Sequence, residues 1–375
     1  MAPHNKPLEF IGMISTRNAS ETHDAPGLEG VIDKTYASTF ARAHEHAGFD
    51  RVLIGYGSGS PDGFQVAAYA AQQTDRLKLL LAHRPGFVAP TVAARQLGTL
   101  DQFTDGRLAV HIITGGSDQE QARDGDHLGH DERYERTDEF LDVLKLAWTS
   151  SEPFDYEGRH YQIKANPAIV RPLQKPHIPI YFGGASEPAI RVAGKHADVY
   201  ALWGESLEGV KERISQVRAS AAAHGREDRI RFSLSLRPVL GRTEDEAWAR
   251  AERILETAKG QRSQREADGR PGRRGGGQSQ AVGSQRLLAT AAQGRVVDKR
   301  LWTEIAALNG GGGNSTGLVG TPEQVAEGLL EYWELGVSTI LIRGFEPLED
   351  ALQYGRYLIP LVREEVHRRQ SALAA

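Results

Sequence analysis

Four arginines, each within three residues of the end of a short apolar run, are suited to holding an anion. They are Arg17, Arg84, Arg237 and Arg343. A guanidinium stays charged and presents a planar fork of N–H donors, so it binds anionic oxygens through charge-assisted hydrogen bonds. Trp203 follows a similar run and adds an aromatic surface. We therefore expect a site for a small anionic molecule if the fold brings these side chains together.

A second candidate site is the glycine turn Gly183-Gly184-Ala185-Ser186. It lies between an expected strand and an expected helix, whose first turn offers free backbone N–H groups to a phosphate. A tight turn that needs glycine for its geometry alone explains these four residues equally well. A place late in a barrel would favour phosphate binding, because barrels often hold phosphate near their later strands.

The segment from His127 to Tyr134 collects imidazoles, carboxylates and a phenol before an expected helix. A metal site is the weaker interpretation, because His127 and His130 are three residues apart and no matching ligand pair occurs elsewhere. Hydrogen bonding to a cofactor phosphate or sugar chain is the stronger one. We expect no metal in this protein. His44 and His46 lie on different faces of an expected helix, and we interpret them as structural.

Several classes of chemistry are excluded by composition. The 375-residue chain has no cysteine, so thiolate nucleophiles, disulfides and cysteine-ligated metals are absent, and redox chemistry requires a bound cofactor. No P-loop occurs, and Gly55 to Ser60 does not match the dinucleotide fingerprint. The net charge of -4 gives no reason to expect nucleic acid. The start of the chain lacks a secretory signal and no long apolar run occurs, so we expect a cytoplasmic protein without membrane contact.

Short apolar runs alternate with stretches of helical period, which is typical of βα units around a parallel sheet. The expected strands are Leu8–Ile14, Arg51–Ile54, Leu77–Ala82, Leu108–Ile113, Ile178–Phe182, Val199–Leu202, Arg231–Leu236 and Val337–Ile342. Eight such strands favour a closed (β/α)₈ barrel, that is, a TIM barrel with insertions, over an open doubly wound sheet, which remains the alternative. In a barrel the strand ends meet at one mouth, where the arginines, Trp203 and the glycine turns would lie.

Helix limits are also predicted. Apolar residues from Ile32 to Ala47 recur at helical spacing before Gly48, a plausible stop. Thr243 with Glu246, and Thr321 with Gln324, fit the capping box, and Pro322 strengthens the second.

Two insertions are expected within this single domain, which we take to span residues 1–375. In residues 152–164, apolar and polar side chains alternate on both sides of Glu157-Gly158, as in a β-hairpin. Residues 259–316 are rich in Gly, Arg, Gln and Ser, with Arg273-Arg274 before one glycine run and Gly310 to Gly313 forming another. So long a connection is either functional or a solvated excursion, and we interpret it as a mobile lid over the active site.

Five segments resemble the alkanesulfonate monooxygenases of the bacterial luciferase-like flavin monooxygenase superfamily, in the same order over residues 8 to 360. They are RPGFVAPTVAARQLGTLDQFTDGR (84–107), ITGGSDQEQARDGDHLGHDERYERTDEF (113–140), PIYFGGAS (179–186), ALWGES (201–206) and TGLVGTPEQVAE (316–327). The resemblance implies a (β/α)₈ barrel that binds reduced FMN from a separate NAD(P)H-dependent FMN reductase and uses molecular oxygen. It also implies a homodimer or homotetramer.

The resemblance further assigns residue roles. Tyr134 and Ser186, with the backbone of Gly184 and Ala185, would hold the flavin phosphate, and His130 is a further cofactor-binding candidate from the same segment as Tyr134. His111 and Thr114 would lie along the isoalloxazine edge. Trp203 would close the substrate side, and the substrate's anionic head group would meet Arg17, Arg84, Arg237 and Arg343. In the sulfonate enzymes the reaction ends with cleavage of a carbon–sulfur bond, giving an aldehyde and sulfite.

On the substrate side the chain departs from that family. Arg17 stands where a histidine is expected, Ser60 or a neighbour where a cysteine is expected, and Phe345 where a tyrosine is expected. On the seventh strand, the family's arginine and histidine are replaced in this chain by Ser235 and Arg237. In the lid, the family's arginine is replaced by Asn309. A plain alkanesulfonate therefore becomes doubtful, although another sulfonate, a sulfone or a different small oxidisable molecule fits.

Four hypotheses follow. The first is a reduced-FMN-dependent oxygenase that cleaves a carbon–sulfur bond, and the second is an oxygenase of the same fold acting on a chelate, amine or hydrocarbon. The third is a deazaflavin-dependent oxidoreductase working without oxygen. The fourth is a flavin-binding protein without catalysis, for which the arginines would have no evident use. Sulfite release separates the first two, and oxygen consumption excludes the third.

Overall fold

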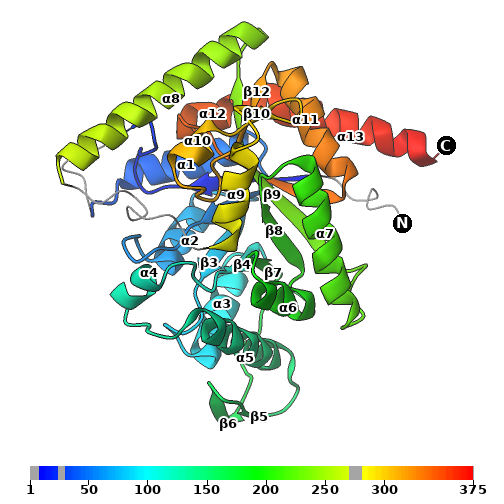
Figure 1. Ribbon diagram of the computed structural model, residues 1–375. Coiled ribbons are helices and arrows are strands. Elements are labelled where there is room, and N and C mark those ends of the chain that lie inside the picture. Colours follow the sequence, from blue (N-terminus) through cyan, green and yellow to red (C-terminus); the bar gives the residue numbers. More distant parts are fainter. Residues whose placement is uncertain (1–7, 24–29, 270–280, 375) are drawn as a thin grey trace. The chain divides into compact units, whose positions relative to one another are not determined.

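The computed structural model describes residues 8–23, 30–269 and 281–374. Its principal sheet contains a ring of eight strands in the order β9-β13-β1-β2-β3-β4-β7-β8, and β8 also pairs with β9. The pairs with known register, such as β3 with β4 and β4 with β7, run parallel. The chain therefore folds as a (β/α)₈ TIM barrel, as the sequence predicts. Figure 1 shows the helices that alternate with these strands.

All eight predicted strands belong to this ring. They are β1 (Glu9–Ile14), β2 (Arg51–Ile54), β3 (Lys78–His83), β4 (Leu108–Ile112), β7 (Ile180–Gly183), β8 (Val199–Trp203), β9 (Arg231–Leu240) and β13 (Val337–Ile342). Strand β3 shows why they could be recognised, because every residue from Leu79 to His83 is buried, as is usual for parallel strands covered on both faces. Strand β9 is four residues longer than expected, because residues 237–240 pair with the additional strand β12 (Gly317–Gly320).

The helices follow local signals. They are α1 (Lys34–His46), α2 (Gly63–Gln72), α3 (Pro90–Phe103), α4 (Asp118–Arg123), α5 (His130–Thr149), α6 (Glu187–His196), α7 (Leu207–Ala222), α8 (Glu244–Ala267), α9 (Val282–Ala291), α10 (Glu304–Leu308), α11 (Pro322–Glu334), α12 (Pro347–Gln353), the π-helix η1 (Tyr354–Leu358) and α13 (Ile359–Ala374). Helix α1 ends before Gly48, which adopts a φ of 80°. Thr321 and Gln324 form the expected capping box at α11.

The capping box expected at α8 is only half formed. The Thr243 side chain accepts a hydrogen bond from the Glu246 backbone N–H, as predicted. The Glu246 carboxylate instead accepts bonds from the backbone and side chain of Arg242. The nearby guanidinium competes with the Thr243 N–H for that carboxylate, so the reciprocal bond is missing.

The two insertions differ from each other in structure. Residues 152–164 contain the antiparallel strands β5 (Phe154–Glu157) and β6 (Gln162–Asn166), as the alternating pattern indicates. The predicted lid starts within α8, which continues to Ala267. Its later part contains α9, α10 and the short strands β10 (Val296–Val297) and β11 (Leu301–Trp302). Arg273-Arg274 and the first glycine run lie outside the described residues.

The chain divides into two compact units. Unit 1 comprises residues 1–52, 201–215 and 231–375, and unit 2 comprises residues 53–200 and 216–230. In unit 1, strands β9, β12 and β13 pack with helices α8 and α11. In unit 2, α5 packs against both α3 and α6, and the β5–β6 hairpin extends beyond α5 (Figure 1).

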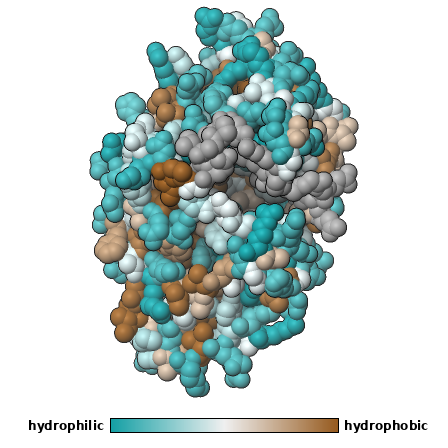
Figure 2. Space-filling view, turned by 90° about the vertical axis from the view of Figure 1, so that its left-hand side faces the viewer, coloured by the Kyte–Doolittle hydropathy of each residue, from teal (hydrophilic) through white to brown (hydrophobic). Residues whose placement is uncertain are grey.

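The surface is mostly polar. On the face shown in Figure 2, hydrophilic residues predominate and hydrophobic ones occur in small groups between them. Within unit 2, Phe103 and Ile169 are examples of large apolar side chains left exposed. Among the described residues, every helix is too short or too polar to cross a lipid bilayer.

Asp101 should stabilise unit 2 by joining α3 to the segment before β7. Its fully buried carboxylate accepts hydrogen bonds from the backbone N–H groups of Leu173 (2.8 Å) and Gln174 (3.2 Å), and from Gln174 Nε2 (2.7 Å). Asp101→Ala leaves these donors unpaired and is expected to lower the free energy of unfolding by about 2–3 kcal/mol. Chemical denaturation checks this, with the exposed Glu152→Ala as control. Equal stability of the two variants would contradict the assignment.

Candidate functional site

The glycine turn of unit 2 forms a narrow cradle at the start of α6. Gly184 has a φ of 152°, and a Cβ placed there would lie 2.9 Å from the Tyr134 hydroxyl and 2.7 Å from the Ala189 Cβ. Ser186 is the N-cap residue of α6, but its side chain makes no capping bond. Its buried Oγ lies beside the Tyr134 phenol and makes no other hydrogen bond among the described residues. The cradle therefore offers a hydroxyl and free helix N–H groups close to a phenol, as a phosphate group requires.

Tyr134 reaches this cradle from helix α5. Burial raises the pKa of its phenol, while Ser186 and Arg133 act in the opposite direction. The phenol therefore remains protonated near neutral pH and can donate a hydrogen bond. The ring of His130 lies 5.0 Å from that of Tyr134, but His130 is exposed and its Nδ1 contacts Asp131 at 2.6 Å. His130 thus lies beside the cradle rather than within it.

His111 and Thr114 lie at the end of β4. Burial lowers the pKa of His111 to about 4, so its ring is neutral, and its buried Nδ1 has no partner among the described residues. Thr114 Oγ1 lies 3.2 Å from Thr137 Oγ1, and the Thr114 carbonyl accepts a bond from Gln121. His111 therefore retains a hydrogen-bonding nitrogen for a ligand, whereas Thr114 is engaged with its neighbours.

Arg84, one of the four candidate arginines, is engaged with neighbouring side chains. Its Nη1 donates to Gln121 at 2.8 Å and its Nη2 to Glu120 at 3.1 Å. The guanidinium also lies 4.7 Å from the centre of the Tyr56 ring. These contacts account for the buried charge, so Arg84 stabilises the β3–α3 connection instead of presenting a free cation.

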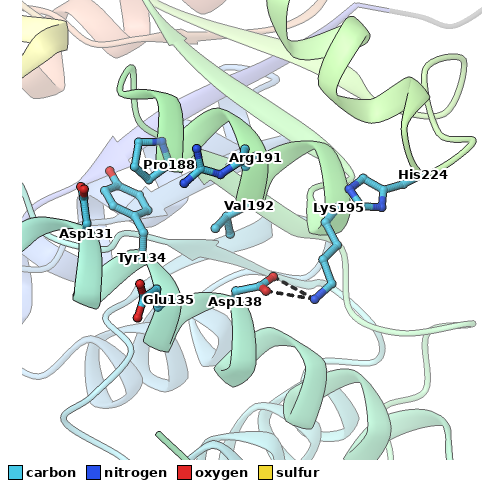
Figure 3. A pocket seen from close by; sticks show the side chains of 9 residues that line it. All are labelled: Asp131, Tyr134, Glu135, Asp138, Pro188, Arg191, Val192, Lys195 and His224. Atoms are coloured by element: carbon cyan, nitrogen blue, oxygen red, sulfur yellow. Dashed lines mark hydrogen bonds and ion pairs between the residues drawn. The ribbon is translucent and has the colours of Figure 1, made fainter. Parts of the chain in front are cut away.

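A pocket of about 310 Å³ lies between α5 and α6 (Figure 3). Tyr134 and Pro188 line one end, and Lys195 and Asp138 lie further along. Asp138, Asp142 and His196 have the spacing of a metal site. However, Lys195 Nζ lies 3.0 Å from Asp138 and 2.8 Å from Asp142, so an ammonium group already neutralises these carboxylates.

In unit 1 an ion triad joins the segment after β1 to an arginine within β9 and an arginine directly after β13. Arg237 is fully buried, with its Nη1 3.0 Å from Glu21 and its guanidinium 3.5 Å from the centre of the Phe345 ring. Arg343 donates from Nη2 to the same carboxylate at 2.9 Å. We refer to Glu21, Arg237 and Arg343 as the ion triad. Sequence reasoning did not single out Glu21, because nothing in its local pattern links it to arginines more than 200 residues away.

Trp203, also in unit 1, is held between two glycines. A Cβ at Gly283 would lie 2.8 Å from the indole, and one at Gly313 would lie 2.5 Å from it. Thr316 Oγ1 donates to the carbonyl of Gly204, the residue after Trp203. The second glycine run thus allows close packing on an aromatic side chain. Arg17 is half-buried, and its backbone bonds with Ser15.

The described part of the expected lid is attached to unit 1 by charge. Arg286 on α9 donates from Nε to both oxygens of Glu205, at 3.0 and 2.8 Å, and from Nη2 to Glu212 at 2.9 Å. Hydrogen bonding to Glu205 raises the pKa of Arg286. Helix α9 is therefore anchored to the segment that follows Trp203. Asn309 is the C-cap of α10, and Ser235 has a buried, unpartnered hydroxyl on β9.

The buried histidines should make stability depend on pH. Burial lowers the pKa of His44, His83, His111 and His196 from 6.5 to about 4. Between these values the unfolded chain binds protons that the folded chain does not, so stability falls as the pH falls from about 6.5 to 4. His111→Gln should reduce this slope by about 1.4 kcal/mol per pH unit. Denaturation at several pH values measures it, with the exposed His46→Gln as control, and an unchanged slope for His111→Gln would contradict the assignment.

Comparisons with solved structures show the same fold in several flavin-related enzymes. A riboflavin lyase (RcaE) solved with modified FMN and riboflavin has a TM-score of 0.77 at 20% identity, covering 96% of this chain and 92% of that one. EDTA monooxygenase (EmoA) from Chelativorans sp. BNC1 has a TM-score of 0.76 at 18% identity, covering 96% and 94%. DmoA from Hyphomicrobium sulfonivorans has a TM-score of 0.74 at 21% identity, covering 96% and 89%.

A family model provides the assignment. The model described as "Luciferase-like monooxygenase" matches residues 8–339. This range includes the cradle of unit 2, Trp203 and the first half of β13. The chain therefore belongs to the luciferase-like monooxygenase family.

Proposed function

We propose that this protein is a two-component monooxygenase that uses reduced FMN and molecular oxygen to oxidise a small organosulfur compound. For a sulfonate, the reaction would cleave the carbon–sulfur bond. One oxygen atom would enter the aldehyde and the other would leave as water, with release of sulfite and oxidised FMN. The bound flavin would supply the two electrons that activate oxygen.

The observation that carries the proposal is the cradle at the start of α6. Ser186 has a buried hydroxyl that makes no capping bond and lies beside the Tyr134 phenol, Gly184 leaves no room for a Cβ, and Tyr134 is protonated. Ser186, Tyr134 and the backbone of Gly184 and Ala185 would hold the FMN phosphate, where the helix N-terminus favours a negative charge. His130 would add a contact from the exposed side.

Other residues would orient the flavin and the substrate. His111 would offer its neutral, unpartnered nitrogen to the flavin edge, with Thr114 beside it. Trp203, packed between Gly283 and Gly313, would exclude water on the substrate side. Arg343 would receive an anionic head group, with Arg237 buried beside it and Arg17 as a further cation. Reduced FMN would come from a separate NAD(P)H-dependent FMN reductase in the cytoplasm, and the protein would act as a homodimer or homotetramer.

Removing single groups from the cradle should weaken FMN binding. Tyr134→Phe and Ser186→Ala each remove one hydroxyl and are expected to raise the dissociation constant of FMN about tenfold. Gly184→Val should abolish binding, because its side chain fills the space beside the Tyr134 hydroxyl. Flavin fluorescence titration measures these changes. Tyr161→Phe, at a buried phenol away from the cradle, is the matched control. Equal affinity in all variants would place the flavin phosphate elsewhere.

Coupled turnover tests the reaction. The protein is mixed with FMN, a generic flavin reductase, NADH and oxygen, and the sulfur product is measured, which is sulfite for a panel of sulfonates and a sulfinate for a panel of sulfones. This product should appear only when this protein is present. If FMN binds and substrate-dependent oxygen uptake occurs without sulfite from any sulfonate or sulfinate from any sulfone, the carbon–sulfur assignment is wrong while the monooxygenase assignment stands.

Two alternatives have specific support. EDTA monooxygenase and the long-chain alkane monooxygenase (LadA) share this fold at TM-scores of 0.76 and 0.73, which favours testing chelates and hydrocarbons as substrates. The coenzyme F₄₂₀-dependent tetrahydromethanopterin reductase of Methanopyrus kandleri has a lower TM-score of 0.66. A deazaflavin enzyme would transfer hydride without consuming oxygen, so oxygen uptake separates it from both monooxygenase hypotheses.

A further inference from the structure

The ion triad contains an internal carboxylate in contact with both of its arginines, of which Arg343 is proposed to meet the substrate. Glu21 Oε2 lies 3.0 Å from Arg237 Nη1, and Glu21 Oε1 lies 2.9 Å from Arg343 Nη2. One carboxylate between two guanidinium groups leaves a net charge of about +1, from elementary charge counting. The arginine pair therefore presents half the positive charge that the sequence alone suggests.

The position of Glu21 is set by its own segment. The neighbouring Thr22 Oγ1 lies 2.9 Å from the Phe345 carbonyl and 3.1 Å from Glu346 Oε1. His23 Nε2 lies 3.0 Å from Glu346 Oε2. These contacts join residues 20–23 to the connection between β13 and α12, so the carboxylate is held against the arginines by several independent bonds.

The two arginines differ in what they can offer to a ligand. Arg237 is fully buried between Glu21, the Gly344 carbonyl and the Phe345 ring. Arg343 keeps 28% of its side chain exposed, and its Nη1 has only a weak contact, at 3.5 Å, with the sulfur of Met13. Buried donors without a partner among the described residues include the Nε of both arginines and the hydroxyls of Ser235 and Thr339. Arg343 is therefore the arginine of the triad that a ligand can reach.

Glu21 remains ionised under working conditions. Burial acts to raise the pKa of its carboxyl, but Arg237 and Arg343 outweigh burial and lower it well below its usual value. Burial lowers the pKa of Arg237 only to about 10, so this guanidinium also stays charged at neutral pH. The charge balance of the triad is thus constant across the physiological range.

We propose that Glu21 is a specificity-determining residue that limits the substrate's head group to a neutral sulfonyl group or a single negative charge. This inference rests on the proposed function, because it places the substrate's head group at Arg343. A neutral sulfonyl oxygen or one sulfonate can accept bonds from Arg343, whereas a dianion would exceed the available positive charge and be repelled by Glu21. The substrate class is therefore neutral or monoanionic.

Two probes of nearly the same shape test the proposal by direct binding. Methanesulfonate carries one negative charge and dimethyl sulfone carries none, and their dissociation constants can be measured by ligand-observed NMR without flavin. Glu21→Gln removes the carboxylate charge and should tighten methanesulfonate about tenfold, with little change for dimethyl sulfone. Sulfate, a dianion, should gain more than methanesulfonate in this variant. Glu21→Asp keeps the charge and is the matched control, with a ratio of the two affinities like that of the wild type.

Arg343→Gln provides a second test that does not disturb the buried pair of Glu21 and Arg237. It should raise the dissociation constant of methanesulfonate at least tenfold and change that of dimethyl sulfone by a factor of no more than about two. It also covers the case in which Glu21→Gln does not fold, because a buried guanidinium without its partner is destabilising.

The proposal is wrong if the ratio of the two affinities is the same in wild type, Glu21→Gln and Arg343→Gln, or if no form of the protein binds methanesulfonate. FMN binding is measured separately. A protein that fails to bind FMN but shows the charge-dependent ratio would overturn the proposed function and not the role of Glu21.

Discussion

A guanidinium taken out of water must find an opposite charge and hydrogen-bond acceptors, because an unpaired buried cation is too costly to retain. Arg237 meets this constraint through Glu21, the Gly344 carbonyl and the face of Phe345. The requirement joins the segment after β1 to β9 and to the end of β13, three parts of the chain that are distant in sequence. The position of Arg343, and with it the charge presented to a substrate, depends on the same carboxylate.

The proposed anion site of unit 2 depends on backbone geometry, whereas that of unit 1 depends on paired charges. The proposed attraction of the α6 cradle for an anion comes from the helix N-terminus, Ser186 and Tyr134, and the charge of Arg133 also acts on the Tyr134 phenol. The cradle would recognise a phosphate by shape. It has room for one because Gly184 has no side chain, and any Cβ at this position would crowd Tyr134 and Ala189. A flavin phosphate held in this way would leave the substrate site free to differ, because a site's chemistry is set by its own residues and not by the fold.

The fold could be predicted from the sequence because the barrel strands are short, apolar and buried on both faces, as β3 illustrates. The cradle could be predicted because a glycine turn between a strand and a helix has a local signature. The extent of β9 could not, since its last four residues pair with β12, which starts 77 residues after β9 ends. The expected lid was drawn from composition, but hydrophilic residues 259–267 form the end of α8, a polar helix for which low hydrophobicity is no sign of a loop.

Glu21 was missed for a different reason. A counter-ion is recognised by distance in space, and the residues around Glu21 carry no periodicity or motif that assigns it to Arg237. The same limit applies to Arg84, where the sequence shows a cation at a strand end and only the structure shows Glu120 and Gln121 beside it. The charge of a substrate can therefore be deduced from the charged residues near a predicted site only when the ion-pair partners of those residues are known.

The central claim is that a flavin phosphate binds at the start of α6, and a crystal structure of the FMN complex tests it most directly. Phosphate oxygens are expected within hydrogen-bond distance of the Tyr134 hydroxyl, Ser186 Oγ and the backbone N–H of Ala185. A phosphate bound instead at Arg237 and Arg343, with the α6 cradle empty, would contradict it.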